Sequence, residues 1–369
     1  MLYHLLYPLA DQYTFLNLFR YITFRAAGGM ATAIVIAFLF GPPIIRWLQR
    51  LRFGQVVRQE GPQSHLSKAG TPTMGGVLII VATMTGTLLW ADLTNEYVLI
   101  AMAVMVWLGA LGFLDDYLKV VRRRTEGLVG KYKLIGQGMI GIIVGVVLLI
   151  WPVSDIPSHW TSVPFFADYH IAFIVPALFV PWVMLVLAGS SNAVNLTDGL
   201  DGLAGGLSAI AAATFAVFAY VIGRVDTSNY LGLFYMAGAG ELSIFCVALA
   251  GATLGFLWFN AHPAEVFMGD TGSLALGGAL GAVAVLIKGE FLLVIVGGVF
   301  VVEALSVMAQ VGWFKYTART RGRGERLFEM APLHHHFEKL GWAESKIIMR
   351  FWILGILCSL VAFSTLKIR

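Results

Sequence analysis

The stretch Asn192-Ala-Val-Asn195-Leu-Thr-Asp198-Gly-Leu-Asp201-Gly202, here called the Asn/Asp motif, lies between two long apolar runs. Its polar residues recur at every third position, a spacing that puts neighbouring side chains on one side of a helix or a tight turn. Because the flanking runs are long enough to cross a bilayer, we expect the motif at a membrane boundary. Ionisable groups there are costly and indicate function, with a simple helix cap as the alternative.

The composition excludes an ordinary soluble domain. Of the 369 residues, 58% are hydrophobic and only 12% are charged, whereas about a quarter of a typical soluble domain is charged. Apolar stretches of about 18 to 22 residues recur along the chain, which is the length needed to cross a hydrocarbon core of roughly 30 Å. The expected fold class is therefore an all-α polytopic membrane protein, with residues 1–369 forming one integral membrane domain.

The hydropathy pattern predicts about ten transmembrane helices. They cover approximately residues 25–45, 73–90, 97–114, 134–151, 171–189, 203–222, 237–259, 272–287, 291–313 and 347–366. Residues 1–20 are aromatic and amphipathic, and they lack the cleavage pattern of a signal peptide. Cys246 and Cys358 lie inside predicted spans, so we expect buried thiols and no disulfide.

The distribution of basic residues predicts the orientation in the membrane. The loops at 42–72, 115–133 and 314–346 hold 18 of the 25 Lys and Arg residues, and the positive-inside rule assigns them to the cytoplasm. An even number of spans then puts both termini in the periplasm. The Asn/Asp motif and the loop at 260–272 fall on the cytoplasmic face. All polar clusters of interest therefore share one side of the membrane.

An acidic doublet ends the third predicted span. Asp115 and Asp116 are adjacent, and two neighbouring carboxylates repel each other unless a cation or a proton relieves them. Lys119, three residues beyond Asp116, is a candidate partner. A charged pair that only ends the span is the alternative, but a doublet on the same face as the Asn/Asp motif favours function.

A second polar group joins the seventh and eighth spans. Asp270-Thr-Gly-Ser273 opens an apolar helix, where an aspartate is often only an N-cap. Asn260, His262 and Glu265 precede it within a 14-residue stretch, which is more polarity than a cap requires. Phe267 in the same loop is placed either to stack on a nucleotide base or at the membrane interface.

Three consecutive histidines, His334, His335 and His336, lie in the last basic loop. Adjacent positions diverge on a helix, so we interpret them as phosphate donors or orienting groups and not as zinc ligands. Upstream, Glu303 and Gln310 share one face of the ninth span because they are seven residues apart. A proton relay and a satisfied interior group explain Glu303 equally well.

These groups together predict a class of chemistry. Carboxylates beside cations, without a thiolate, favour Mg²⁺, with Mn²⁺ as the alternative ion. Mg²⁺ is usually held by one or two carboxylates plus substrate phosphates, so we expect phosphoryl transfer between a soluble donor and a lipid. No Walker A, Rossmann or kinase motif is present, so ATP and NAD are not expected as cofactors, and neither is a nucleic-acid partner.

Six motifs carry a resemblance to a known family. They are Phe53-Gly-Gln-Val-Val-Arg58, Lys68-Ala-Gly-Thr-Pro-Thr-Met-Gly-Gly76, Gly112-Phe-Leu-Asp115-Asp116-Tyr-Leu-Lys119, Asn195-Leu-Thr-Asp198-Gly-Leu-Asp201-Gly-Leu-Ala204, Phe267-Met-Gly-Asp270-Thr-Gly-Ser273 and Pro332-Leu-His334-His-His-Phe-Glu338. Over nearly its whole length the chain resembles the polyprenyl-phosphate N-acetylhexosamine-1-phosphate transferases. The motifs that begin at Lys68 and Pro332 are similar to those of the phospho-N-acetylmuramoyl-pentapeptide transferase branch.

The resemblance implies an enzyme of the bacterial cytoplasmic (inner) membrane that uses Mg²⁺. It would transfer phospho-MurNAc-pentapeptide from UDP-MurNAc-pentapeptide to undecaprenyl phosphate, giving lipid I and UMP. Transfer of GlcNAc-1-phosphate is the alternative within this class, and a transporter or flippase is the alternative from another class. Direct attack is favoured over a covalent phospho-enzyme, and the oligomeric state, including a homodimer, stays open.

Carried over position by position, the resemblance also implies residue roles. Asp270 looks like the metal ligand, and Asp115 looks like the base that readies the lipid phosphate, with Asp116 supporting it. The expected nucleotide pocket contains Asp198, Asp201, Asn260 and Phe267. The expected charge stabilisers are Lys68, Lys119, Lys133 and His335. Further substrate contacts are expected from Asn195, Gln310, His334 and His336.

Overall fold

The computed structural model describes residues 1–50, 70–122, 127–166 and 176–367, and this part of the chain is helical, with no β-strand in it. The long helices are α2 (Ile22–Arg50), α3 (Gly76–Trp90), α4 (Glu96–Val120), α5 (Gly130–Ile150), α6 (Pro176–Thr197), α7 (Leu203–Ile222), α9 (Leu242–Asn260), α10 (Gly269–Leu286), α12 (Gly298–Arg321) and α14 (Glu344–Ser364). The short helices are α1 (Leu2–Leu6), η1 (Tyr7–Asp11), η2 (Thr14–Arg20), α8 (Val225–Leu231), η4 (Ala239–Glu241), α11 (Glu290–Val296) and α13 (Leu333–Lys339).

The expected polytopic helical class is confirmed. Within the described ranges, nine helical segments are long and apolar enough to cross a membrane. The remaining predicted span corresponds to α3, which is apolar but only 15 residues long. A helix rises about 1.5 Å per residue, so α3 is shorter than the roughly 30 Å hydrocarbon core.

Several predicted boundaries are wrong. Helix α4 runs to Val120 and α12 to Arg321, beyond the predicted ends at 114 and 313. The ninth span is not continuous, because α11 ends at Val296 and α12 starts at Gly298. Adjacent glycines at 297 and 298 explain the break, since glycine is among the poorest helix formers. The fifth span extends further than expected: α6 runs to Thr197, so the first half of the Asn/Asp motif is helical and only its second half forms the turn to α7.

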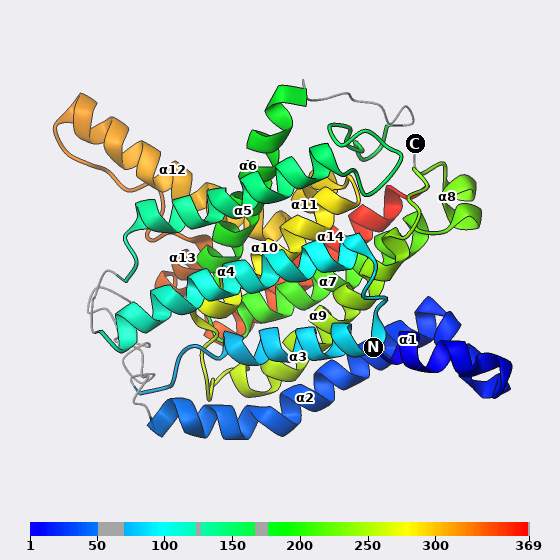
Figure 1. The fold of residues 1–369 in the computed structure, drawn as a ribbon. Helices are drawn as coiled ribbons and strands as arrows, with labels where there is room; N and C mark the ends of the chain where they lie inside the picture. The colour runs from blue at the N-terminus through cyan, green and yellow to red at the C-terminus, as the bar shows by residue number, and fades with distance from the viewer. Residues whose placement is uncertain (51–69, 123–126, 167–175, 368–369) are drawn as a thin grey trace.

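Helix α10 lies at the centre of the bundle, where it is the most deeply buried of the membrane-length helices in the described chain. It packs against α4, α6, α3 and α7, and Figure 1 shows it behind α4 and α5. Its sequence explains this position, because glycine, alanine and other small or aliphatic residues follow Ser273 without a charge before Leu286. Small side chains let the neighbouring helices approach closely.

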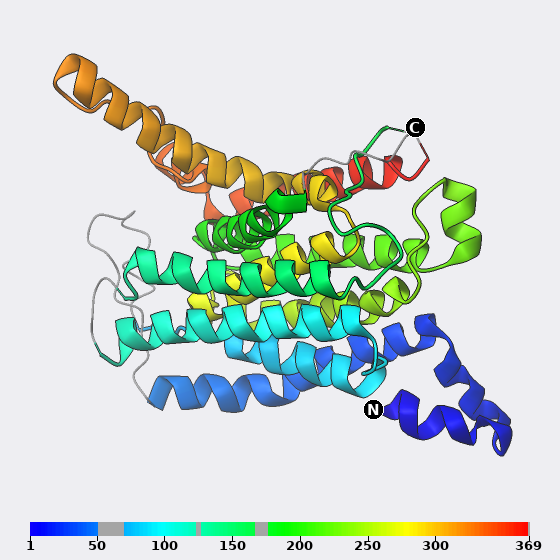
Figure 2. The same ribbon diagram turned by 45° about the horizontal axis from the view of Figure 1, so that its top comes forward.

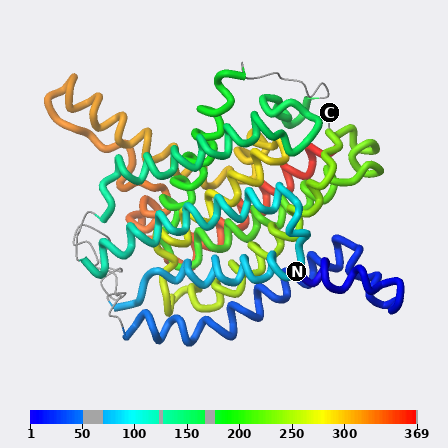
Figure 3. Tube along the Cα trace, in the orientation of Figure 1, coloured from blue at the N-terminus to red at the C-terminus, as the bar shows by residue number. Residues whose placement is uncertain are grey.

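Two parts of the chain extend beyond the bundle. Helix α12 projects from one side, and both the turned view in Figure 2 and the trace in Figure 3 show the same projection. The N-terminal segment, α1 to η2, projects at the opposite end (Figure 1). The two chain termini lie at that same end (Figures 1 and 2).

Close approach of α4 to α10 positions the candidate site. A Cβ atom added to Gly112 of α4 would lie 2.1 Å from the backbone oxygen of Asp270, so only glycine fits there. Gly269, immediately before Asp270, has a φ of +71°, and a Cβ there would lie 2.6 Å from Oδ2 of Asp116. These two glycines therefore bring the acidic doublet of α4 to the first turn of α10.

The cysteines are free thiols, as expected, but the expected burial holds only for Cys246. Cys246 is buried in α9, Cys358 is partly exposed in α14, and neither forms a disulfide.

Candidate active site

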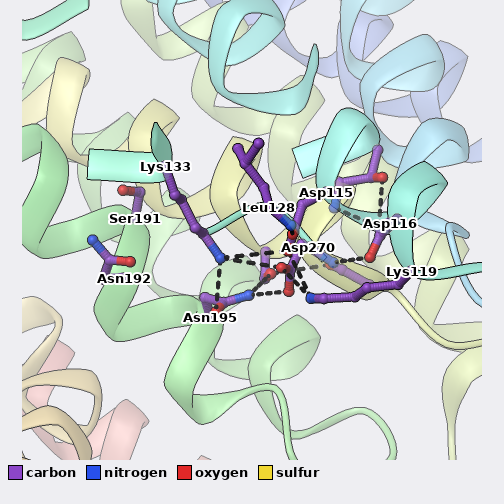
Figure 4. Close-up of polar contacts among 12 residues, drawn as sticks. Asp115, Asp116, Lys119, Leu128, Lys133, Ser191, Asn192, Asn195 and Asp270 are labelled. Atoms are coloured by element: carbon purple, nitrogen blue, oxygen red, sulfur yellow. Dashed lines mark hydrogen bonds and ion pairs between the residues drawn. The ribbon is translucent and has the colours of Figure 1, made fainter. Parts of the chain in front are cut away.

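Four helices bring charged and amide side chains to one end of the bundle (Figure 4). Asp115 and Lys119 lie near the C-terminal end of α4, Lys133 lies in the first turn of α5, Asn195 lies near the end of α6, and Asp270 lies in the first turn of α10. We call these five residues the carboxylate–lysine cluster. The predicted convergence of the doublet, the Asn/Asp motif and the loop before α10 therefore occurs.

Two ammonium groups meet the carboxylate of Asp270. Lys119 Nζ lies 2.8 Å from Asp270 Oδ2, and Lys133 Nζ lies 3.1 Å from the same oxygen. Lys119 Nζ also lies 2.6 Å from Asp115 Oδ2, whereas Lys133 Nζ is 3.9 Å from that oxygen. Positive charge between these two carboxylates relieves the repulsion between Asp115 and Asp270.

Neutral donors fix the remaining oxygens of these two carboxylates. The side-chain amide of Asn195 donates to Asp270 Oδ1 at 2.7 Å and to Ser273 Oγ at 2.8 Å. The backbone N–H of Leu128 donates to Asp115 Oδ1 at 2.5 Å. Each carboxylate therefore has one oxygen held by a neutral group and one oxygen that faces the lysines.

Asp116 faces away from the lysines and caps α10 from the side. Its Oδ1 accepts the backbone N–H of Asp270 at 3.1 Å, and its Oδ2 accepts the N–H of Thr271 at 2.9 Å and the Thr271 hydroxyl at 2.7 Å. The first N–H groups of a helix lack partners within the helix, and the N-terminus carries the positive end of the helix dipole. A carboxylate there both accepts these N–H groups and is stabilised by the dipole. The doublet thus divides its functions: one acid faces the cluster, and the other holds the helix that carries Asp270.

Asp198 lies in the turn after α6 and is near the cluster without being bound to it. Within the described part of the chain no hydrogen bond or ion pair is formed by its carboxylate. Burial, followed by the charges of Asp270, Asp116 and Asp201, raises the pKa of Asp198 to about 8. A carboxylate in this state binds a cation or a hydrogen-bond donor favourably, because either would relieve the cost of its charge.

Two other residues of the expected nucleotide pocket are Asp201, in the turn between α6 and α7, and Asn260, at the end of α9. Asp201 is buried, and its Oδ2 accepts the N–H of Ala264 at 3.1 Å and lies 3.2 Å from His262 Nδ1. Asn260 is also buried; its amide donates to Val266 O at 2.9 Å, while its Oδ1 has no partner among the described residues.

Phe267 lies in an extended segment beside the cluster. Its N–H donates to Pro72 O at 2.8 Å, and its carbonyl accepts from Gly75 N at 2.9 Å, while the ring is half-buried. Lys68, the first residue of the motif that contains Pro72 and Gly75, lies outside the described residues.

The three histidines begin the short helix α13, which packs on the Asn/Asp motif. A Cβ atom on Gly199 would lie 2.2 Å from His334 Nε2 and 3.1 Å from His335 Nε2. His335 Nδ1 lies 2.7 Å from Glu338 Oε2, and His336 Nδ1 accepts the N–H of Glu329 at 3.2 Å. His334 and His335 therefore lie together against Gly199, with ring centroids 4.2 Å apart, and the predicted divergence holds only for His336.

His334 differs from its neighbours because it is fully buried. Its backbone N–H donates to Glu303 Oε1 at 3.1 Å, and its Nδ1 lies 3.3 Å from Glu303 Oε2. Glu303 Oε1 is thus bound by α13, whereas Glu303 Oε2 and both ring nitrogens of His334 are buried without a hydrogen-bond partner among the described residues, so both explanations of Glu303 stay open.

Gln310 does not face the cluster. Its side-chain oxygen accepts the N–H groups of Leu327 and Phe328 at 3.0 and 2.9 Å, and its amide donates to Phe328 O at 3.3 Å. The expected substrate contact is therefore occupied by the segment that returns from α12, and Gln310 serves as a clamp for that segment.

Several contributors to the site were not predicted from the sequence. Thr271 and Leu128 complete the surroundings of the acidic doublet, and Glu344 at the start of α14 binds the Asn/Asp motif by accepting the N–H of Asp201 at 3.0 Å. Thr271 was discoverable because it follows Asp270 directly. The Leu128 contact uses a backbone group, and Glu344 is 143 residues from Asp201, so neither carries a local signal.

An apolar cavity of about 280 Å³ opens between α6, α10, α11 and α12. It is lined mainly by aliphatic and aromatic side chains, including Trp182, Val186, Leu280, Phe291 and Phe300. Its size and lining suit a hydrocarbon chain.

The carboxylate–lysine cluster has the donor set that Mg²⁺ prefers. Asp270 and Asp115 supply hard carboxylate oxygens, Asp198 lies close by with an unused carboxylate, and no cysteine belongs to the cluster. The convergence of two ammonium groups on Asp270 shows that positive charge is stable at this oxygen. These residues therefore fit a magnesium ion.

Comparison with known proteins first defines the class. Residues 97–288 match the family described as Glycosyl transferase family 4, a region that begins in α4 and ends just beyond α10. Residues 68–80 match the Phospho-N-acetylmuramoyl-pentapeptide-transferase signature 1. The fold and the site thus belong to a polytopic membrane transferase.

Curated relatives then identify the family within this class. The chain is 55% identical to the phospho-N-acetylmuramoyl-pentapeptide-transferase of Gemmatimonas aurantiaca and 55% identical to that of Citrifermentans bemidjiense. It is 54% identical to the enzyme of the same name from Maricaulis maris, and all three alignments cover 100% of both chains. This chain belongs to the phospho-N-acetylmuramoyl-pentapeptide-transferase family.

Proposed function

We propose that this chain transfers phospho-MurNAc-pentapeptide from UDP-MurNAc-pentapeptide to undecaprenyl phosphate in the bacterial inner membrane. The products are lipid I and UMP. The observation that carries the proposal is the carboxylate–lysine cluster at one end of the bundle, in a full-length relative of enzymes with this name. The apolar cavity beside α12 supports a lipid as the second substrate, because a prenyl chain needs an apolar surface.

The reaction exchanges one phosphoanhydride for another. An oxygen of the lipid phosphate attacks the sugar-bearing phosphorus of the donor, a new P–O–P bond forms, and the bond to UMP breaks. The attacking oxygen already belongs to a phosphate, so little basicity is needed and most of the rate comes from position and charge neutralisation. Magnesium, when bound, neutralises the diphosphate and favours departure of UMP.

The residues of the cluster have separate tasks in this reaction. Asp270 is the proposed metal ligand, and Asn195 and the backbone contact to Asp116 hold it in place. Lys119 and Lys133 exchange their carboxylate contacts for phosphate oxygens when the donor binds. Asp115 accepts the proton of the lipid phosphate if that oxygen arrives protonated, and attack is direct.

Nucleotide recognition is assigned to the adjacent turn and loop. The half-buried ring of Phe267 stacks on the base. Asn260 is buried and its amide donates to Val266 O, so it holds the loop segment that carries Phe267. Asp198, Asp201, Lys68 and His335 complete the pocket. The full burial of His334 favours an indirect contribution from this residue.

The test is a reconstituted assay with radiolabelled UDP-MurNAc-pentapeptide, undecaprenyl phosphate and Mg²⁺ in detergent. We expect a lipid-linked product and an equal amount of UMP, with loss of both after chelation of the metal and recovery with Mg²⁺ or Mn²⁺. A product formed from UDP-GlcNAc but not from the muramoyl donor would support the alternative transferase. Absence of any lipid-linked product would support a transporter.

A further inference from the structure

Three ligand-bearing side chains from distant segments meet beside the Asn/Asp motif. Asp201 lies in the turn between α6 and α7, His262 lies in the loop between α9 and α10, and Glu344 is the first residue of α14. His262 Nδ1 lies 3.2 Å from Asp201 Oδ2 and 3.5 Å from Glu344 Oε2. One donor atom from each residue lies within 4.8 Å of the other two.

The backbone holds the two carboxylates in position. The N–H of Asp201 donates to Glu344 Oε1 at 3.0 Å, and the N–H of Ala264 donates to Asp201 Oδ2 at 3.1 Å. The side chains of Asp201 and Glu344 are 3% and 9% exposed, whereas that of His262 is 40% exposed. The arrangement is therefore rigid on the buried side and open on the histidine side.

The spacing matches a particular coordination geometry. In a tetrahedral zinc site with bonds of 2.0–2.1 Å, neighbouring ligand atoms are about 3.3 Å apart. Both distances from His262 Nδ1, 3.2 and 3.5 Å, agree with this value. A neutral imidazole has only one ring proton to offer two carboxylates, whereas a metal ion satisfies all three groups at once.

We propose that Asp201, His262 and Glu344 form a zinc site. Imidazole combined with carboxylates suits Zn²⁺, whereas Mg²⁺ prefers an all-oxygen shell. Three protein ligands leave a fourth position open on the exposed side of His262, as in zinc sites that retain a water. The bound ion joins the α6–α7 turn, the α9–α10 loop and the start of α14. This site does not include the proposed magnesium ligand Asp270, and it shares Asp201 with the proposed nucleotide pocket.

The experiment uses the full-length chain in detergent, with any polyhistidine tag removed and without Mg²⁺. Zinc is titrated in competition with a chromophoric chelator, and cobalt is titrated while visible absorption is recorded. We expect one zinc ion to bind tightly to each chain. We also expect bound cobalt to show the strong visible absorption that is typical of tetrahedral coordination. H262A and E344Q should each weaken zinc binding by about 100-fold or more, because each removes one of three ligands.

A matched control is available in the same chain. His4 Nε2 lies 3.1 Å from Asp92 Oδ1, and the His4 side chain is 39% exposed, which nearly equals the distance and exposure of His262 in its contact with Asp201. This contact has only one carboxylate, so H4A should leave the zinc affinity unchanged. H336A controls for the three consecutive histidines in the same way.

Thermal unfolding without zinc shows whether each variant is folded. If H262A does not fold, E344Q decides the result, because glutamine keeps the size and the acceptor oxygen of Glu344. Zinc binding that is equally tight in wild type and E344Q would overturn the site. So would loss of the tightly bound zinc ion in H4A or H336A, and then the three groups form only an ion-paired contact.

Discussion

At the scale of single residues, Asp270 is the group on which the cluster converges. Its two carboxylate oxygens accept a hydrogen bond from Asn195 and form ion pairs with Lys119 and Lys133. Its backbone N–H donates to the carboxylate of Asp116. No other carboxylate in the described chain has two lysine ammonium groups within 3.1 Å of one oxygen. Substitution at this position should therefore be the most damaging in the site.

We expect Asp270→Asn to lower Mg²⁺-dependent turnover by at least about 10³-fold, because a neutral amide neither holds the metal nor balances two lysines. The measurement is formation of lipid-linked product at saturating substrates. Asp226→Asn is the control, since Asp226 is exposed and pairs only with nearby Arg224 in the described structure. Normal Mg²⁺-dependent activity in Asp270→Asn would refute the metal assignment.

Asp115→Asn separates catalysis from donor binding. The amide keeps the shape of the carboxylate but cannot accept a proton from the lipid phosphate, so we expect turnover to fall by about 10²-fold or more. Donor affinity should change little and is measured by binding of the UDP-sugar without lipid. If donor binding disappears together with turnover, Asp115 belongs to the nucleotide pocket.

Asp198 makes stability depend on pH. Its folded-state pKa of about 8 exceeds the unfolded value of about 3.9. Between these two values the folded chain binds the extra proton, so the stability contribution of Asp198 decreases as pH rises from about 4 to about 8 and is constant outside this window. Each unit of the difference corresponds to about 1.4 kcal/mol.

The prediction is that Asp198→Asn removes this part of the pH dependence. The melting temperatures of wild type and variant, measured with a metal chelator from pH 5 to pH 9, should diverge, with the variant relatively more stable at high pH. Parallel curves for the two proteins would contradict the raised pKa.

At the scale of helices, the apolar runs predicted most spans because their length reflects the membrane and not the neighbours. The predicted span 203–222 coincides with α7. The break between α11 and α12 was not predicted because a pair of glycines is tolerated in many membrane helices. The division of tasks between Asp115 and Asp116 was also hidden, since it depends on the rotation of α4 about its axis.

The contact between α4 and α10 gives a test at this scale. Gly112→Ala adds a methyl group that would lie 2.1 Å from the Asp270 carbonyl oxygen, so the helices must separate. We expect a loss of stability of about 1–3 kcal/mol and a much larger loss of turnover, because the separation moves Asp270.

Gly312→Ala is the matched control, because a Cβ at this position in α12 has no atom within 4 Å in the described chain. Thermal unfolding and the transfer assay are compared for both variants. Equal activity of Gly112→Ala and wild type would show that the close approach does not position the site.

At the scale of the whole molecule, an ion pair secures the end of the bundle opposite the cluster. Arg25 of α2 makes two hydrogen bonds to Glu241, at 2.7 and 2.5 Å, and the backbone N–H of Asp92 donates to the same glutamate at 2.9 Å. Glu241 thus joins α2, the turn before α4 and the start of α9. Arg25 was not predicted as its partner because the two residues are 216 positions apart.

The membrane orientation is a prediction from the basic loops, and reporter fusions test it. A reporter inserted at Glu96, at the start of α4, should be active in the periplasm, and one inserted at Arg323, after α12, should be active in the cytoplasm. The two sites lie at ends of membrane-length helices. Reporters that mark the same side would overturn the topology and place the cluster differently.

Because Asp116 caps α10 while Asp115 faces the lysines, the site depends on the rotation of α4 about its axis, and therefore on the exact number of residues that precede the doublet in α4. Successive residues of a helix point about 100° apart, so a slip of α4 by one position would aim Asp115 at the α10 backbone and turn Asp116 out of its place. A single inserted or deleted residue in the apolar part of α4 would leave the hydropathy intact. An insertion would put Asp115 in the place of Asp116 and Leu114 in the place of Asp115, whereas a deletion would put Asp116 in the place of Asp115 and Tyr117 in the place of Asp116. In either case the chain would still insert while its chemistry was lost.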